Sequence, residues 1–442
     1  MKKQFMKNLR DNMPEPLIYM ASPLFRNMLI QNEEFCKYYK MLEERKSLNK
    51  ETIKEYQFNK LKEIIIYSYV NVPYYHELFN RISFDPYKFS DFRQIEQIPL
   101  LTRELVTQNF DMLISTKKVK NGYYIGQTGG STGTPLKFYL DYDSIYKENA
   151  FIYYYRKKLG YGFRDKLATF RVLGYGEKLW RYNPMYKEIL FSTTRLAKST
   201  ISEYARRINE FKPQYLNGYL SAIWYLAKLL KEYHIDIKFK LKGIFLISEN
   251  IDDSQREFIE KFFNTKSSTF YGHSERAVIA EEVEQNKYVF DPYYGYTEQI
   301  QCKEDEYSIV STGFLNKTMP FIRYQTDDIC IPEEQYYRIE GKRSSTICLR
   351  GKNNEFLTST GFNIGMEIFT KFINYQFIQT ERGKVDLFII VNNEFQPQEL
   401  IALQKKLDKQ TNGVIDIKIK IVDKLVLTER GKFQKYISNI VN

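Results

Sequence analysis

Histidine and cysteine are scarce in this chain of 442 residues. It has three histidines and four cysteines, and the cysteines lie far apart without a CxxC pair. A zinc site built on cysteine therefore lacks a ligand set. His76 and His234 have no accompanying motif for a metal site or a Ser–His–Asp triad. We expect the cysteines to be reduced thiols.

Long apolar runs are also missing. No run approaches the ~18 residues of a membrane-spanning helix. No sustained apolar stretch follows the N-terminal lysines before residues 12–15. We therefore expect no transmembrane segment and a cytoplasmic location. The length is sufficient for two or three domains with sizeable cores.

Acidic residues are outnumbered by basic ones. Lys plus Arg number 66 and Asp plus Glu number 54, which gives a formal net charge of +12. This charge favours polyanionic ligands such as ATP, coenzyme A or an anionic surface polymer, without choosing among them. Aromatic residues reach 16% of the chain, but there is no arginine–aromatic repeat, so nucleic-acid binding is not expected.

The most informative stretch is glycine-rich and covers residues 124–135, with the sequence Tyr-Ile-Gly-Gln-Thr-Gly-Gly-Ser-Thr-Gly-Thr-Pro. Glycine reaches positive φ and lets backbone N–H groups approach phosphate oxygens, and the hydroxyls add donors. No Gly-Lys-Ser or Gly-Lys-Thr follows, so this is not a Walker loop. A polar turn between two strands is the alternative interpretation.

Further motifs precede and follow this loop in a fixed order. They are Val-Pro-Tyr-Tyr (72–75), Ile-Pro-Leu-Leu-Thr-Arg (98–103), Phe-Lys-Pro-Gln-Tyr-Leu-Asn-Gly-Tyr (211–219), Ile-Ser-Glu (247–249), Tyr-Gly-His-Ser-Glu (271–275), Pro-Phe-Ile-Arg-Tyr-Gln-Thr-Asp-Asp (320–328) and Thr-Glu-Arg-Gly-Lys (428–432). Together they resemble the adenylate-forming superfamily, whose members activate carboxylic acids with ATP. The resemblance is greatest to its phenylacetate–coenzyme A ligase-like branch, including the capsule-locus (CapK-type) members.

The predicted fold class is α/β. The resemblance implies a large N-terminal ATP- and acyl-binding domain over residues 1–340 and a small mobile C-terminal α+β domain over residues 341–442. Residues 1–115 are expected to be mainly helical, with helical apolar spacing over residues 53–69. Short β-like segments, at residues 307–311 and 328–331, dominate residues 288–340.

Alternation of strands and helices indicates parallel strands in the middle of the chain. We expect strands at residues 137–141 and 243–247 and helices at residues 143–159, 215–233 and 252–263. In the C-terminal part we expect helices at residues 366–377 and 397–409 and strands at residues 385–391 and 416–422.

The resemblance implies a role for each candidate residue of the phosphate and base site. Tyr271 and Gly272 would flank the adenine, and Ser274 would meet the α-phosphate. Glu275 would be a catalytic ligand of Mg²⁺, because hard cations prefer carboxylate oxygen; a solvated or helix-capping charge at a turn is the alternative. The loop residues that would hold the β- and γ-phosphates are Thr128, Gly129, Gly130, Ser131, Thr132 and Gly133.

Other implied roles concern the ribose, the acyl group and the reacting atoms. Asp328 would accept hydrogen bonds from both ribose hydroxyls. Ser248 and Glu249 follow a strand and would lie beside the adenine or the acyl pocket, while helix capping by Glu249 is an equal alternative. Lys432 would bridge the substrate carboxylate and the α-phosphate as a catalytic cation; an exposed basic tail is the alternative.

Several positions depart from the pattern of the family. Asp327 stands where glycine is usual, and Lys137 is offset from the usual basic residue after the loop. Gly341, Lys342 and Arg343 stand where the family has Gly-Arg, so either Lys342 replaces the arginine or Arg343 takes its place by a small shift. Either supplies a cation for ribose or phosphate, although only arginine offers a bidentate fork. Residues 344–345, both serine, replace the hinge acid, which bears on domain rotation.

These residues predict an ATP- and Mg²⁺-dependent carboxylate-activating ligase. It would form an acyl-adenylate, release pyrophosphate and pass the acyl group to coenzyme A. One alternative acceptor is an amine, an amino sugar or a carrier protein in surface-polysaccharide biosynthesis. A nucleotide-binding relative without catalysis is the other alternative. The sequence identifies neither the carboxylic acid nor the oligomeric state.

Overall fold

The computed structural model describes residues 17, 21–22, 31–128, 136–171, 173, 178–196, 199–340, 349–353, 355–357, 372–391, 395–422, 426, 436–438 and 440. The chain forms two compact units. The first comprises residues 1–128, 136–162 and 268–342, and the second comprises residues 129–135, 163–267 and 343–442. The expected division into domains of residues 1–340 and 341–442 stays a prediction.

Helices with polar caps open the first unit. The Asn32 side chain accepts a hydrogen bond from Phe35 N, and the Asn49 side chain accepts one from Thr52 N. The helix expected over residues 53–69 is confirmed within α4. The elements are α3 (Glu33–Glu44), η1 (Arg45–Ser47), α4 (Lys50–Asn71), α5 (Pro73–Arg81), η2 (Pro86–Lys88), η3 (Phe92–Gln97) and α6 (Arg103–Gln108).

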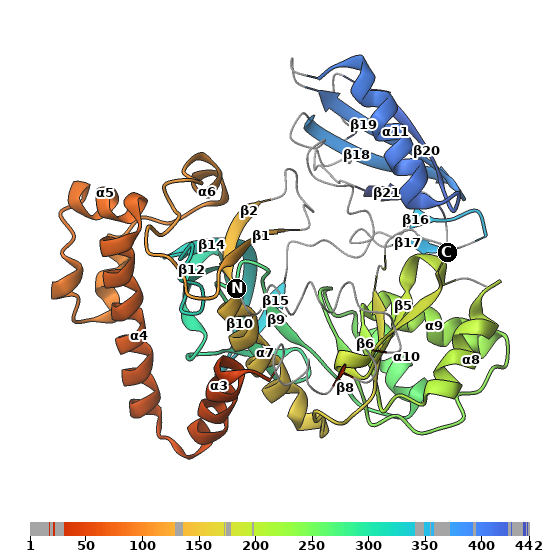
Figure 1. The fold of residues 1–442 in the computed structure, drawn as a ribbon, viewed down its shortest axis with the longest axis horizontal. Coiled ribbons are helices and arrows are strands. Elements are labelled where there is room, and N and C mark those ends of the chain that lie inside the picture. Colours follow the sequence, from red (N-terminus) through yellow and green to blue (C-terminus); the bar gives the residue numbers. More distant parts are fainter. Residues whose placement is uncertain are drawn as a thin grey trace. The chain divides into compact units, whose positions relative to one another are not determined.

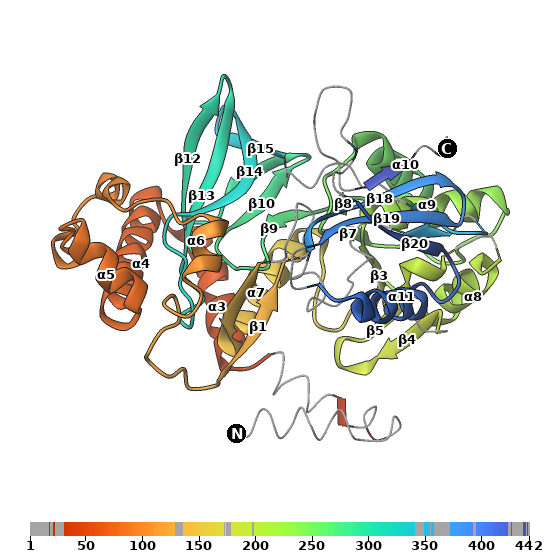
Figure 2. The same ribbon diagram turned by 90° about the horizontal axis from the view of Figure 1, so that it is seen from above.

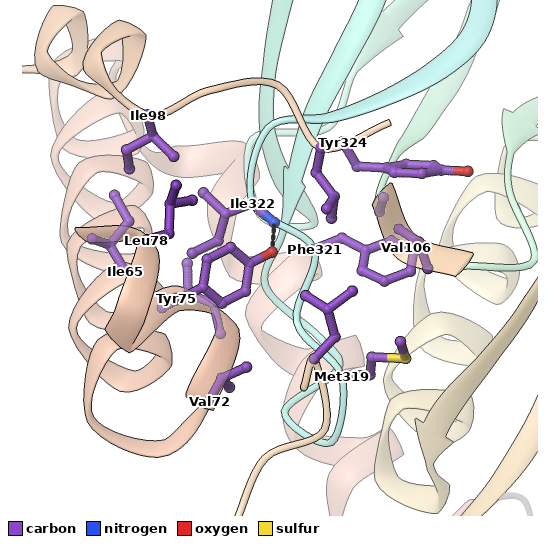
Figure 3. Close-up of a cluster of buried hydrophobic side chains, with 14 of the residues drawn as sticks. Ile65, Val72, Tyr75, Leu78, Ile98, Val106, Met319, Phe321, Ile322 and Tyr324 are labelled. Atoms are coloured by element: carbon purple, nitrogen blue, oxygen red, sulfur yellow. Dashed lines mark hydrogen bonds between the residues drawn. The ribbon is translucent and has the colours of Figure 1, made fainter. Parts of the chain in front are cut away.

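The break between α4 and α5 has a local cause. Val72 is extended, as expected of a residue before proline, and Pro73 opens α5, where a missing N–H is tolerated. The buried Tyr75 hydroxyl accepts a hydrogen bond from Ile322 N (3.0 Å) (Figure 3). It also donates one to Pro320 O (3.1 Å). This residue therefore ties the helical segment to the chain that leads into β14.

The main sheet of the first unit has seven antiparallel strands in the order β12-β13-β14-β15-β11-β10-β9 (Figure 2). A separate hairpin of β1 and β2 flanks the glycine-rich stretch, and α7 and η4 follow it. The bounds are β1 (Tyr123–Gln127), β2 (Lys137–Asp141), α7 (Tyr142–Arg156), η4 (Lys157–Leu159), β9 (Phe270–Gly272), β10 (Ile279–Glu284), β11 (Lys287–Phe290), β12 (Gly295–Lys303), β13 (Glu306–Gly313), β14 (Tyr324–Glu333) and β15 (Tyr336–Glu340).

The second unit contains a six-stranded sheet in the order β4-β5-β3-β6-β7-β8 (Figure 1). Strands β5, β3, β6 and β7 are parallel, as their alternation with helices predicts. The bounds are β3 (Leu167–Arg171), β4 (Trp180–Asn183), η5 (Pro184–Tyr186), β5 (Glu188–Ser192), η6 (Thr193–Arg195), α8 (Ile201–Phe211), β6 (Tyr215–Gly218), α9 (Leu220–Glu232), β7 (Gly243–Leu246), α10 (Asp253–Phe263) and β8 (Ser267–Ser268).

A four-stranded sheet in the order β20-β19-β18-β21 forms the C-terminal part of the second unit. Leu387 on β19 and Leu403 and Leu407 on α11 are fully buried in its core. The bounds are β16 (Leu349–Arg350), β17 (Phe356–Leu357), β18 (Phe372–Glu381), β19 (Lys384–Val391), α11 (Pro397–Thr411), β20 (Asp416–Ile421) and β21 (Tyr436–Ser438).

Two of the expected helices are wrong in part. The helix expected over residues 215–233 begins only at Leu220, because residues 215–218 form β6, buried between β3 and β7. The helix expected over residues 366–377 is wrong over residues 372–377, which belong to β18; residues 366–371 lie outside the described part. Phe372, Tyr375 and Phe377 are buried and pair with β19, so tertiary pairing outweighed helical spacing.

The other expected elements are confirmed within a few residues of their ends. They are the strands at residues 137–141, 243–247, 307–311, 328–331, 385–391 and 416–422 and the helices at residues 143–159, 252–263 and 397–409. Among the described residues, no helix is both long enough and apolar enough to span a bilayer.

Candidate active site

Glu275 lies in the turn that connects β9 to β10. Its side chain is buried, and one carboxylate oxygen accepts a hydrogen bond from the Tyr324 hydroxyl on β14 (3.2 Å). The next residue, Arg276, fixes the turn through a buried ion pair with Glu148 on α7 (2.9 Å). Glu275 is therefore a buried carboxylate that accepts from Tyr324, rather than a solvated charge.

Tyr271 and His273 both contact the carboxylate of Asp328. The Tyr271 hydroxyl donates to Asp328 Oδ2 (3.0 Å), and His273 Nε2 lies 2.7 Å from the same oxygen. The two side chains are also 2.8 Å apart at their polar atoms. An ionised carboxylate only accepts, so we assign the proton on Nε2 to the bond with Asp328.

Burial and the neighbouring charge of Asp328 raise the pKa of Tyr271 well above its ordinary value. The hydroxyl therefore stays protonated and acts as a hydrogen-bond donor to Asp328. This bond joins Tyr271 on β9 to Asp328 on β14, 57 positions apart in the sequence. The two strands are not neighbours in the sheet.

The backbone conformation at Asp327 explains how aspartate takes the position where the family usually has glycine. Asp327 has φ of 66°, in the left-handed region that glycine adopts readily and aspartate tolerates better than most residues. Thr326 Oγ1 accepts a hydrogen bond from Asp328 N (3.3 Å). The backbone therefore takes a glycine-like conformation at Asp327, and the side chain of Asp328 meets Tyr271 and His273.

Arg323 supports the backbone of this segment. Its guanidinium pairs with Glu298 (2.8 Å) and donates to the carbonyl oxygens of Glu96 (3.1 Å) and Ile98 (2.6 Å). With only 7% of its surface exposed, it fixes the backbone rather than facing a ligand.

Within the glycine-rich stretch, Thr128 is hydrogen-bonded to Leu136, the residue that follows the stretch. Thr128 N donates to Leu136 O, and Thr128 Oγ1 accepts from Leu136 N, each at 3.0 Å. The same hydroxyl oxygen accepts from the guanidinium of Arg103 (3.0 Å). The sequence analysis gave Arg103 no role, because only the fold brings α6 next to Thr128.

Lys137 is close to the loop in sequence, but this closeness alone does not give it the role of the family's usual basic residue. It is exposed on β2, where Leu136, Phe138 and Leu140 supply the buried face. Gly272 and Ser274 are exposed on either side of His273, and their contacts with a nucleotide stay predictions.

Glu249 follows β7 in the second unit. Its carboxylate accepts hydrogen bonds from Ser221 N (3.0 Å) and Ser221 Oγ (2.8 Å) at the start of α9. Burial raises the pKa of Glu249 to about 7, against the opposing effect of the two bonds. These contacts favour the helix-capping alternative for Glu249. Ser248 beside it is exposed, with φ of 60°.

Comparison with known proteins agrees with the order of the motifs. A scan against models of known protein families found no match. The protein CapK of Staphylococcus aureus is 25% identical over 452 aligned positions, which cover 96% of this chain and 99% of CapK.

Solved structures reveal the same fold. One is 2-hydroxyisobutyryl-CoA ligase in complex with 2-HIB-AMP and CoA in the thioesterification state, with a TM-score of 0.57, 14% identity, and coverage of 89% of this chain and 91% of that one. The same ligase in the postadenylation state with R3-HIB-AMP gives a TM-score of 0.52, with 14% identity and coverage of 87% and 89%. The chain therefore has the fold of these ligases and is similar to CapK over nearly its whole length.

Not every predicted site residue falls in the described part of the chain. Gly129, Gly130, Ser131, Thr132, Gly133, Lys342, Arg343 and Lys432 lie outside it. In the part that the structure describes, no group of three or more His, Cys, Asp or Glu side chains could hold a metal ion. A divalent ion at Glu275 would therefore need further oxygen ligands, such as phosphate oxygens and water.

Proposed function

We propose that this CapK-type chain is an ATP-dependent carboxylate-activating ligase. The acid's carboxylate oxygen attacks the α-phosphorus of ATP, the bond from that phosphorus to the bridging oxygen breaks, and pyrophosphate leaves with the electron pair. The acyl-adenylate then passes its acyl group to the thiol of coenzyme A and releases AMP. The adenylate-forming fold supports this class of reaction, since the 2-hydroxyisobutyryl-CoA ligase structures carry an acyl-AMP and CoA.

One observation carries the proposal. Tyr271 and Asp328, which the resemblance assigns to the adenine and the ribose, are joined by a hydrogen bond of 3.0 Å in the first unit. Glu275 follows Tyr271 by four residues and is buried against Tyr324 of the same strand that carries Asp328. The groups proposed for base, ribose and Mg²⁺ thus lie on β9, on β14 and in the turn after β9, and two hydrogen bonds link them.

Within this site each residue has a defined task. Asp328 would accept from the ribose hydroxyls with its carboxylate oxygens, while Tyr271 and His273 keep it in place. Glu275 would supply a carboxylate oxygen to Mg²⁺, which neutralises charge on the phosphates. Lys432 would supply positive charge at the reacting carboxylate and α-phosphate.

The test is ATP–pyrophosphate exchange with the purified chain against a panel of carboxylic acids. Exchange that depends on one acid and on Mg²⁺ reports adenylate formation without knowledge of the acceptor. Thioester formation is then measured with coenzyme A and the active acid. Absence of exchange with every acid, together with measurable ATP binding, would instead favour a nucleotide-binding protein without catalysis.

A further inference from the structure

A pocket of about 270 Å³ lies in the first unit, where α3, α4 and α7 meet the connection between β13 and β14. None of the residues that line it belongs to the candidate active site. Its volume is below the roughly 300–1,000 Å³ of pockets for drug-sized ligands, so it suits a small ligand. The charged side chains that line it are Glu34, Lys37, Lys60, Glu63, Lys147 and Lys317.

The walls of this pocket are fixed by contacts within the first unit. Between α3 and α7 (Figure 1), the Tyr38 ring lies 6.3 Å from the ring of Phe151, which is fully buried. In the connection before β14, Lys317 N donates to Asp141 Oδ2 (2.8 Å), and Lys317 O accepts from the Tyr67 hydroxyl on α4 (3.1 Å). The pocket is therefore built into the fold of the unit.

Two of the four lysines in the pocket are paired with one carboxylate. Glu63 accepts from Lys60 Nζ (2.6 Å) and from Lys317 Nζ (2.8 Å). Burial raises the pKa of Glu63, but the bonds from Lys317 and Lys60 outweigh burial and lower the pKa to about 2. Glu63 therefore stays ionised, and these three side chains together retain one positive charge.

The other two lysines, Lys37 and Lys147, have no carboxylate partner among the described residues. Neither side chain forms a hydrogen bond or an ion pair in that part of the chain, and Lys147 Nζ lies 5.6 Å from the centre of the Tyr38 ring. Glu34 is the remaining carboxylate of the lining. Four lysines against two glutamates give the pocket a net charge of +2.

The Tyr38 hydroxyl adds a neutral donor to the pocket. Burial and then the charges of Glu34 and Glu63 raise the pKa of Tyr38 well above its ordinary value, so the hydroxyl stays protonated. No acceptor for its hydrogen is present among the residues that the structure describes. Two ammonium groups and one hydroxyl thus line the same small pocket, each able to donate to a ligand.

We propose that this pocket binds the phosphate group of a small ligand, with Lys37, Lys147 and the Tyr38 hydroxyl as donors. A phosphate monoester carries about −1.5 to −2 charges at pH 7 and has three strong acceptor oxygens, which matches the charge and the donors of the pocket. Lysine binds phosphate as a point charge. The proposal does not depend on the ligase function, because none of these residues takes part in it.

Calorimetric titration of the full chain with inorganic phosphate and with glycerol 3-phosphate tests the proposal. We expect Lys37→Gln/Lys147→Gln to weaken binding by about tenfold or more, as for loss of charge-assisted hydrogen bonds, and Tyr38→Phe to weaken it by about two- to tenfold. The matched control Lys238→Gln/Lys240→Gln removes the same charge from exposed positions of the second unit and should bind like the wild type. The tighter of the two probes distinguishes free phosphate from a phosphorylated metabolite.

Three results would overturn the proposal. The first is the absence of binding to the wild type. The second is equal affinity of the wild type and either pocket variant, because phosphate would then bind elsewhere, for example at the nucleotide site. The third is an equal loss in both lysine pairs, which reports the net charge of the chain rather than the pocket. If Tyr38→Phe fails to fold, Lys37→Gln/Lys147→Gln alone decides.

Discussion

The side-chain amide of Gln376 and the backbone of Val426 exchange two hydrogen bonds. Gln376 Nε2 donates to Val426 O and its Oε1 accepts from Val426 N, each at 2.9 Å. Gln376 is fully buried on β18. A buried amide thus fixes the chain two residues before the Thr-Glu-Arg-Gly-Lys motif, and Gln379 forms the same pair of bonds with Arg350 (2.7 Å each).

Gln376→Leu should destabilise the chain and expose the Val426 amide to exchange. Both backbone groups of Val426 lose their partner, and a typical intramolecular hydrogen bond contributes roughly 0.5–1.5 kcal/mol. Hydrogen exchange at Val426 and the free energy of unfolding are the measurements. Gln335→Leu, an exposed position, is the control; equal protection of Val426 in all three proteins would contradict this role.

Lys432→Ala should abolish adenylate formation and leave ATP binding and folding nearly unchanged. A cation that acts mainly in the transition state affects rate more than ground-state affinity, and we expect a loss of about 10²–10³-fold in exchange rate. Lys435→Ala, another lysine near the C-terminus, tests the basic-tail alternative. The assignment of Lys432 is refuted if the two variants exchange pyrophosphate at equal rates.

Glu275→Gln should lower the rate by about 10²-fold and raise the Mg²⁺ concentration needed for half-maximal activity. The amide is a poorer ligand for a hard cation, and it still accepts from the Tyr324 hydroxyl, so the fold should survive. Titration of exchange activity with Mg²⁺ is the measurement. Glu284→Gln, on exposed β10 surface, is the control, and unchanged titration in Glu275→Gln would return Glu275 to a structural role.

Asp328→Ala should raise the KM for ATP by about tenfold and change kcat less, because ribose contacts exist in both ground and transition states. An ATP analogue without the ribose hydroxyls should be affected little. Asp327→Ala is the control for register. If Asp327 rather than Asp328 shows the ribose-dependent loss, the assignment over residues 323–328 is wrong by one residue.

The raised pKa of Glu249 predicts that the stability of the chain depends on pH. Burial raises the pKa of Glu249 from 4.5 to about 7, so between these values the folded chain binds more protons than the unfolded chain. The contribution of Glu249 to the free energy of unfolding is fully present below pH 4.5 and is lost as the pH rises through 7. The loss is roughly 3 kcal/mol at most. Glu249→Gln should remove this slope in urea unfolding between pH 4.5 and 7, whereas exposed Glu232→Gln should retain it.

The sequence alone determined most of the elements of this protein and its resemblance to known proteins. The order of the motifs indicated a similarity to the CapK-type branch, and local patterns located helices such as α4 and α11 and strands such as β2, β7 and β19. These elements could be predicted because caps, proline and apolar spacing act within a few residues. The same local patterns gave the wrong structure at residues 215–218 and 372–377, where long-range pairing forms β6 and β18.

Only the tertiary structure shows which residues of the candidate site contact one another. The bond between Tyr271 and Asp328, the support of Glu275 by Tyr324, and the contact of Arg103 with Thr128 join residues 25 to 57 positions apart. No local pattern encodes such contacts, because they depend on which strands pair and where α6 is attached. Only the folded backbone, with its positive φ at Asp327, shows how aspartate serves at a position where glycine was expected.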